Sequence, residues 1–290
     1  MKSNLYLCAF ASDDLNLSVQ RFISQAQSLN VYREIKIFRP SDLSNNIKSR
    51  IYNIIKKRGK YLYGFEIWKQ FIINQYISKI PKNSILHYCD IGCHFNTKGF
   101  KRFKEYILLV NKYNFLVFDY SNPSKKFKKY KYKFQINKEY NYTKGDVFKY
   151  FNVNNKSKIY YSPQIWAGSF FLKNCKLSKE ILKIWGDACK KINLLDNSKS
   201  KIKNHSDFIG MRGSQGVFSI ICKLKKVKKI SASECEWAEG LDGSGRKWDH
   251  LKEYPIWAKR DLKYNILKRF TNRQKKTIRR LKKKFEYLFN

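Results

Sequence analysis

SILHYCDIGC, residues 84–93, places a carboxylate directly after a short apolar run. Such a run, ending at a charged side chain, is typical of a buried strand. The following turn contains Gly92, which would let a ligand approach the backbone closely. Since open α/β sheets bind ligands at the carboxyl ends of their strands, Asp90 is a candidate ligand-binding residue. An aspartate after a strand also commonly caps a turn, so this pattern alone leaves both interpretations open.

Segments on either side of this strand continue the pattern. Apolar runs predict further strands over residues 4–11, 31–38, 115–119 and 167–173. Helical spacing of apolar residues predicts helices over residues 18–29, 42–56, 64–79, 100–110, 178–194 and 216–224. Loops are expected over residues 122–142, 196–209 and 232–250. This alternation predicts an α/β domain over residues 1–260, with a Rossmann-like mixed sheet flanked by helices.

The charge balance is extreme, with 61 basic and 22 acidic residues among 290 and a net charge of +39. A nucleic-acid-binding protein is one hypothesis for such a chain. However, 48 of the basic residues are Lys and only 13 are Arg, the residue best suited to bidentate recognition of phosphate and guanine. We therefore expect no specific nucleic-acid partner.

Cysteine usage bears on the compartment. The seven cysteines show no regular framework, and four of them (Cys8, Cys175, Cys189 and Cys222) lie in apolar segments, as small core residues do. Free thiols are typical of a reducing compartment. The first residues lack the long apolar segment of a signal peptide. The sequence therefore predicts a cytoplasmic protein.

The C-terminal segment differs in kind from the rest. Residues 259–290 contain 13 basic and 2 acidic residues. We expect a basic amphipathic helix over residues 261–290, which could bind an anionic membrane surface through 262–290. Peripheral attachment to the inner membrane would follow. The alternative is that its apolar stripe packs on the domain.

A zinc site is a rival interpretation of the first stretch. His87, Cys89, Cys93 and His94 are the residue types that zinc prefers. Four ligands within eight residues of strand and turn would not easily surround one metal ion, so this alternative is the weaker one.

Several segments together resemble a family of bacterial glycosyltransferases with a nucleotide-sugar-binding fold of the GT-A type, found in lipopolysaccharide and capsule assembly. Each segment is modest alone, but they occur in the family's order. They are FAS at 10–12, SVQRFISQA at 18–26, RG at 58–59, GFEIWK at 64–69, YCDIGC at 88–93, TKGDVF at 143–148, QIWAG at 164–168 and YPIWAKR at 254–260.

The resemblance implies a GT-A-like fold, a nucleoside-diphosphate-sugar donor (a UDP-sugar above all), and Mn²⁺ or Mg²⁺. Asp90 would be a reduced form of the metal-binding Asp-x-Asp motif, in which Gly92 replaces the second carboxylate. Water or donor phosphates would then complete the coordination. Donor binding is implied for Ser12, Arg21, Trp68, Lys69, Asp90, Gly92 and Arg212, and a sugar pocket for Gln164, Ala167 and Gly168. The alternatives are a core position for Trp68 and a tightly packed strand for Ala167 and Gly168.

One departure from the family concerns residues 211–215, MRGSQ, where the family carries His-Arg-His-Asp-Gln. Arg212 and Gln215 match, but both histidines and the aspartate are absent. If that aspartate serves as the catalytic base, Asp207 or Asp146 could replace it, so the candidate catalytic residues are Asp207, Asp146 and Gln215.

The sequence thus predicts a metal-assisted glycosyltransferase that moves a sugar to a surface polysaccharide or lipooligosaccharide, a glycan or glycolipid acceptor. The altered segment 211–215 supports a second hypothesis, a membrane-associated assembly factor that has lost catalysis. The net charge supports the third, a nucleic-acid-binding protein.

Overall fold

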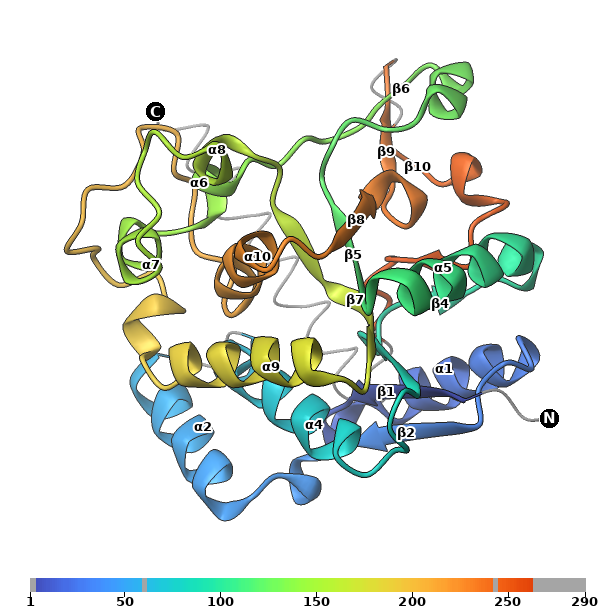
Figure 1. Ribbon diagram of the computed structural model, residues 1–290, viewed down its shortest axis with the longest axis horizontal. Coiled ribbons are helices and arrows are strands. Elements are labelled where there is room, and N and C mark those ends of the chain that lie inside the picture. Colours follow the sequence, from blue (N-terminus) through green and yellow to red (C-terminus); the bar gives the residue numbers. More distant parts are fainter. Residues whose placement is uncertain (1–3, 59–61, 242–244, 263–290) are drawn as a thin grey trace, which may run out of the picture.

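The computed structural model describes residues 4–58, 62–241 and 245–262. Its central sheet has the strand order β2-β1-β3-β7-β5-β8 (Figure 1). Within it β1 pairs in parallel with β2 and β3, and β5 with β8, while β7 runs antiparallel to both its neighbours. The strands are β1 Leu5–Phe10, β2 Glu34–Phe38, β3 Ile85–Cys89, β5 Phe115–Asp119, β7 Ile165–Lys173 and β8 Lys228–Ser231. The predicted α/β architecture, a mixed sheet flanked by helices, is confirmed.

Helices cover both faces of the sheet (Figure 1). Because side chains alternate across a strand, neighbouring residues of β7 enter two different cores. Phe170 packs with Trp185 on one face, and Phe171 packs with Phe103 on the other. The first face carries α2 Asn45–Arg58, α4 Ile67–Ile77, α9 Lys176–Cys189 and α10 Gln215–Leu224, and the second carries α1 Asn16–Ser28 and α5 Phe100–Tyr113.

Strand direction decides where the polar strand ends gather. Because β1, β3 and β5 run the same way, the residues that follow them, including Ser12, Asp90 and Tyr120, come to one edge of the sheet. The antiparallel β7 begins at that edge, which brings Trp166 there as well. This is the edge where open α/β sheets place their ligands.

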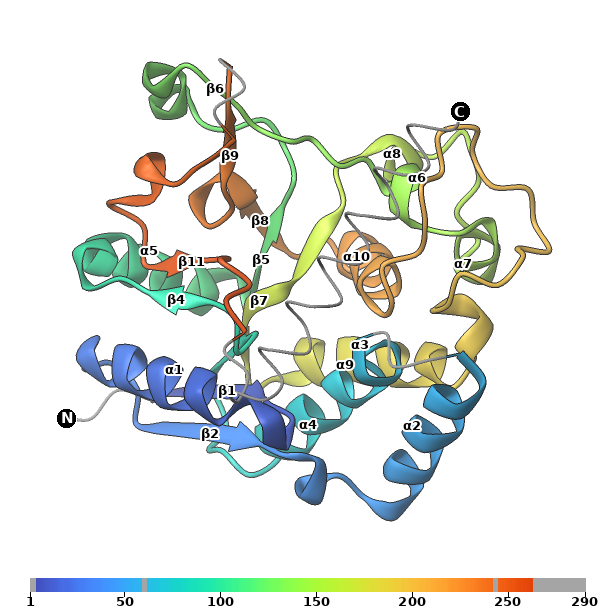
Figure 2. The same ribbon diagram turned by 180° about the vertical axis from the view of Figure 1, so that it is seen from behind.

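Two smaller sheets flank this edge. The strands β4 His94–Phe95 and β11 Ile256–Trp257 pair antiparallel, as seen from behind (Figure 2). The other sheet has the order β10-β9-β6, with β6 Tyr132–Lys133, β9 Ala238–Gly240 and β10 Arg246–Lys247. The expectation of loops over residues 122–142 and 232–250 was therefore wrong in part, because these short strands pair with each other across the sequence.

The remaining helices are short. They are α3 Leu62–Phe65, α6 Glu139–Tyr142, α7 Gly145–Tyr150 and α8 Lys158–Tyr161. The helix expected over residues 178–194 ends at Cys189, and that expected over 64–79 begins at Ile67. Among the described residues, no helix is both long and apolar enough to span a membrane. The helix expected over 261–290 lies outside the described residues beyond Leu262.

Candidate active site

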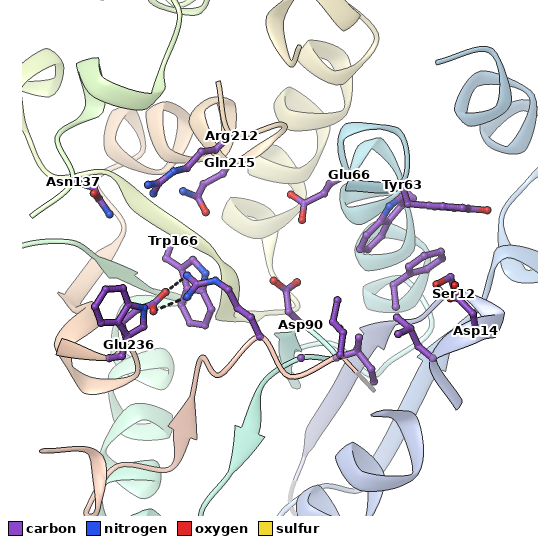
Figure 3. Close-up of a pocket in the computed structure, with 18 of the residues that line it drawn as sticks. Ser12, Asp14, Tyr63, Glu66, Asp90, Asn137, Trp166, Arg212, Gln215 and Glu236 are labelled. Atoms are coloured by element: carbon purple, nitrogen blue, oxygen red, sulfur yellow. Dashed lines mark hydrogen bonds and ion pairs between the residues drawn. The ribbon is translucent and has the colours of Figure 1, made fainter. Parts of the chain in front are cut away.

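A pocket of about 1030 Å³ lies at the carboxyl edge of the central sheet (Figure 3). Its lining comes from two halves of the chain, with Glu66 and Asp90 between them. The first half includes Phe10, Ser12, Asp14, Pro40, Tyr63 and Trp68. The second half includes Tyr120, Phe134, Asn137, Trp166, Arg212 and Trp237. Such a pocket can hold a ligand that has two chemically different parts.

Asp90 lies where β3 ends, and neighbouring groups fix its position. Its amide donates to the carbonyl oxygen of Gly168 at 2.7 Å, which continues the pairing of β3 with β7. Its Oδ1 accepts a hydrogen bond from the Tyr88 hydroxyl at 2.6 Å and lies 3.2 Å from Lys69 Nζ. The carboxylate side chain remains 36% exposed, so a ligand can reach it.

Lys69 is a buried cation, with a side chain only 1% exposed. Its ammonium contacts Glu66 Oε1 at 3.0 Å as well as Asp90, and donates to the Ala167 carbonyl at 3.2 Å. Burial lowers the pKa of Lys69, but the two carboxylates more than offset this, so the pKa lies above its ordinary value. Lys69 therefore stays charged and holds both carboxylates beside the pocket.

Glu66 reaches the pocket from an unusual turn. Four consecutive residues, Tyr63, Gly64, Phe65 and Glu66, have φ values of 48°, 78°, 56° and 61°. These values lie in the left-handed region, which L-residues other than glycine seldom adopt. The first three of these residues lie within α3 and the fourth precedes α4, and this turn points the Glu66 carboxylate toward the space above Asp90 (Figure 3).

Residues 256–261 cross the loop that follows Asp90, and we call them the strap. It begins with β11, which pairs with β4, and ends where the Asp261 amide donates to the Gly92 carbonyl at 3.0 Å. Arg21 binds the loop and the strap together: its guanidinium donates to the carbonyls of Ile91 at 2.8 Å and Asp261 at 3.2 Å. Arg21 does not line the pocket; its contacts instead position the loop that carries Gly92.

The second half of the pocket combines aromatic rings with guanidinium groups. Arg212 lies over the ring of Tyr142, 3.3 Å from its centroid, and Arg246 over Trp237 at 4.7 Å. Neither forms an ion pair with a carboxylate in the described part of the chain. A third guanidinium, that of Arg260, instead binds both carboxylate oxygens of Glu236. Within the described ranges, two cationic groups thus face this half of the pocket without a carboxylate partner.

Gln215 and Gln164 belong to one buried network, of which Gln215 alone reaches the pocket. Gln215 Nε2 donates to Gln164 Oε1 at 2.7 Å, and its Oε1 accepts from the Ala167 amide at 3.3 Å. Gln164 donates in turn to Glu139, a fully buried carboxylate that also pairs with Lys223. These contacts hold α10 against β7. The sugar-pocket role inferred for Gln164 stays a prediction.

The other predicted positions differ in their distance from the pocket. Ser12, Trp68, Asp90, Gly92, Arg212 and Gln215 line it, and Lys69 contacts Asp90 directly. Ala167 and Gly168 do not line the pocket themselves. Gly168 nevertheless affects its shape, because a Cβ at this position would lie only 2.3 Å from the ring of Trp166. Gly168 thus makes room for a ring that does line the pocket.

The structure does not bring Asp146 or Asp207 to this pocket. The Asp146 carboxylate accepts from the amides of Lys201 and Ile202, both at 3.0 Å, and so orders a surface loop. The Asp207 side chain is 62% exposed on the same loop. Neither residue contacts Asp90, and their catalytic role stays a prediction.

The residues of the rival zinc site do not converge. His87 is buried between the Tyr32 hydroxyl and Ser169 Oγ, each 2.8 Å from one of its ring nitrogens. His94 Nε2 instead faces Asp261 Oδ2 at 3.1 Å. Across the described ranges, no three His, Cys, Asp or Glu side chains form a group that could hold a metal ion.

Sequence reasoning missed several residues at the pocket. Glu66 lies inside GFEIWK without any signal of its own, and Glu236 lies in a segment predicted to be a loop. Tyr88 offered a usable signal, because residues i and i+2 of a strand share a face. The contact of the strap with Gly92 could not be predicted, because no spacing of residues in the sequence indicates that these two segments meet.

No known protein-family model and no curated protein matches this sequence. Among solved structures, the chain is similar to a glycosyltransferase involved in the glycosylation of the major capsid of PBCV-1. The TM-score is 0.46 at 10% identity, covering 87% of this chain and 91% of that one. It is also similar to mouse xyloside xylosyltransferase 1 in its apo form, with a TM-score of 0.41 at 10% identity, covering 80% of this chain and 87% of the other.

Proposed function

We propose that this protein is a glycosyltransferase that moves a sugar from a nucleoside diphosphate to a glycan or glycolipid acceptor. The observation that carries the proposal is the position of Asp90. It lies at a strand end between the two halves of a large pocket and is held by Lys69 and Tyr88. The segments that resemble a glycosyltransferase family support it, since FAS, GFEIWK, YCDIGC and the strap all contribute residues to this pocket.

The first half of the pocket suits a nucleotide. Phe10 and Trp68 stack with their ring centroids 4.1 Å apart, and the ring centroid of Tyr63 lies 5.7 Å from that of Phe10. A nucleobase can stack on such a surface, at about 1–3 kcal/mol per base. Ser12 lies at the end of β1, where its hydroxyl can bind a ribose or phosphate oxygen. We favour a UDP-sugar as the donor.

Asp90 would hold a divalent ion, Mn²⁺ or Mg²⁺, together with donor phosphates and water. A single carboxylate with phosphates and water is a normal environment for Mg²⁺, and the exposed Asp90 carboxylate has the oxygen ligand that such an ion prefers. The ion would supply positive charge next to the departing diphosphate. Lys69, Arg212 and Arg246 add cationic groups beside or within the same pocket.

The second half of the pocket suits the acceptor. Trp166, Tyr120 and Trp237 present aromatic rings of the kind that pack on the apolar faces of sugars, and Asn137 adds an amide for hydroxyl groups. Arg212 and Arg246 can bind an oxyanion on the acceptor. A surface polysaccharide or a lipooligosaccharide that carries phosphate or carboxylate groups fits these requirements. Such an acceptor would place the protein at the inner membrane.

The experiment that tests this function measures the thermal midpoint of the purified protein with UDP, GDP, CDP and ADP, each with and without Mn²⁺. A ligand that binds the native state raises the midpoint by mass action. We expect a Mn²⁺-dependent rise with UDP, abolished in Asp90→Asn but kept in Asp187→Asn, whose carboxylate is exposed on α9. A flat response across all four nucleotides would contradict a donor site and would favour an assembly factor without catalysis.

A further inference from the structure

Among the described residues, five carboxylates line the pocket, although the chain as a whole is strongly basic. They are Asp13, Asp14, Glu66, Asp90 and Glu236. If the protein transfers a sugar to a hydroxyl group, as its proposed function states, the reaction requires a proton acceptor near the reacting carbon. Each of the five carboxylates can be judged for that role by its contacts.

Glu236 and Asp90 are engaged in other contacts. Both oxygens of Glu236 bind the Arg260 guanidinium, the Tyr120 hydroxyl donates to Oε1 at 3.0 Å, and the side chain is only 4% exposed. Asp90 pairs with Lys69 and accepts from Tyr88. Glu236 is thus almost closed off from an acceptor, and the proposed function already assigns the Asp90 carboxylate to the divalent ion.

Asp13 and Asp14 lie at the far end of the first half, in the single turn η1 Asp13–Leu15. Asp14 Oδ1 accepts from the Ser12 hydroxyl at 2.5 Å. Figure 3 shows Ser12 and Asp14 on the opposite side of Asp90 from Trp166 and Arg212. An acceptor bound in the second half would therefore lie away from both aspartates.

Glu66 occupies the remaining position, between the two halves. Its side chain is 15% exposed and points into the pocket beside Asp90 (Figure 3). The left-handed turn that delivers it contains three non-glycine residues at positive φ, a conformation that the Cβ atom makes unfavourable. Strain of this kind persists where the surrounding structure enforces it, and it gathers at functional sites.

The contacts of Glu66 suit a proton acceptor. Oε1 lies 3.0 Å from Lys69 Nζ, while Oε2 is 3.5 Å from the Ser214 hydroxyl, a long and weak contact. Burial raises the pKa of Glu66, Lys69 lowers it, and the nearby Asp90 raises it, with a net result above its ordinary value. A carboxylate with a raised pKa is a stronger base and accepts a proton more readily.

We propose that Glu66 is the general base of the transfer. The acceptor hydroxyl gives its proton to a Glu66 oxygen as its own oxygen bonds to the anomeric carbon. The bond from that carbon to the donor phosphate breaks, and its electron pair leaves with the nucleoside diphosphate. Lys69 acts as a positioning residue, because it holds Glu66 next to Asp90 and the diphosphate.

The test is the rate of nucleotide release from UDP-glucose, UDP-galactose, UDP-N-acetylglucosamine and GDP-mannose, with methyl glycosides as acceptors. We expect Glu66→Gln to lower kcat by about 10²–10⁴-fold, while the thermal shift with the diphosphate persists. Glu66→Asp keeps the carboxylate one methylene further back and should recover part of the rate. Glu180→Gln, exposed on α9, is the matched control and should match the wild type.

The pH profile separates a base from a residue that merely binds the sugar. In the wild type, kcat/KM should fall as the pH drops through the raised pKa of Glu66, and Glu66→Gln should lose this acid limb. A normal kcat with a raised KM in Glu66→Gln, or an unchanged acid limb, would overturn the assignment alone. Failure of the wild type to bind any nucleoside diphosphate would overturn the proposed function and the assignment with it.

Discussion

Gly92 and Arg260 meet backbone to backbone: a Cβ on Gly92 would lie 3.0 Å from the Arg260 Cα and 3.2 Å from its carbonyl carbon. In the resemblance to an Asp-x-Asp motif, Gly92 stands where the motif has its second metal-binding carboxylate. The structure gives a second reason for glycine at this position. The strap crosses the loop at Gly92, and a side chain there would leave no room for the strap backbone.

Gly92→Ala should therefore destabilise the protein, by roughly 1–3 kcal/mol. The added methyl group meets backbone atoms, which cannot rotate away. Urea unfolding would measure the loss, and the UDP-dependent thermal shift should shrink with it. Gly186→Ala is the matched control, because its Cβ would meet only the flexible end of Gln70 within a helix. Equal stability of the two variants would contradict the close contact.

Gly168→Ala should displace the ring of Trp166, whose atoms would lie 2.3 Å from the new Cβ. Since Trp166 lines the pocket, we expect kcat/KM for sugar transfer to fall by roughly 10–100-fold. Intrinsic fluorescence would report the ring movement. Adding Trp166→Phe to Gly168→Ala should restore part of the stability, because the smaller ring relieves the overlap. Additive effects of the two changes would contradict this prediction.

Lys69→Met should cost about 3–5 kcal/mol at pH 7, since it leaves two carboxylates without their buried cation. The sign of the pH effect follows from linkage. Loss of Lys69 removes a contact that lowers the pKa of Glu66, which burial already raises, so the folded variant holds a proton on Glu66 more tightly and stability is recovered as the pH falls. Urea midpoints at pH 7 and pH 5 would test this. Lys190→Met removes an exposed ion pair and should cost under about 1 kcal/mol at either pH.

The half-buried imidazole of His94 should make the stability of the wild type fall at acid pH, which is opposite to the effect expected for Lys69→Met. Burial lowers its pKa to about 4, Arg21 and Lys259 lower it as well, and the hydrogen bond to Asp261 opposes them. The folded state therefore resists protonation, and stability is lost as the pH falls from 6.5 toward 4, by up to about 3 kcal/mol. His94→Gln should show a smaller loss over that range in urea unfolding. The same acid dependence in both proteins would contradict the assignment to His94.

The sheet could be predicted from sequence because its strands carry strong local signals. β1, β3, β5 and β7 are buried apolar runs, and each was predicted within two residues of its observed bounds. The short strands β9 and β10 were not, since two or three residues carry too little periodicity. Their partners lie far apart in the chain, and only the folded structure brings them together.

The site was predictable where a residue follows a strand, as Asp90 does, because strand direction sets its place. Glu66 was not predictable, since nothing in YGFEIWK, residues 63–69, indicates four left-handed residues in a row. Arg21 illustrates a third case. Its position in the resemblance suggested donor contact, yet its guanidinium binds backbone carbonyls behind the pocket.

The strap also bears on the order in which the molecule is made. Arg21 donates to the carbonyls of Ile91 and Asp261, which lie 70 and 240 positions further along the chain than Arg21 itself. Loop closure over such a separation carries an entropic cost before any contact forms, so these contacts are expected late in folding. During synthesis, the central sheet can pair while the loop after Asp90 still lacks the strap. A nascent chain that stops before Ile256 would thus have the sheet without the strap, and under the proposed function its nucleotide affinity would be acquired among the last steps.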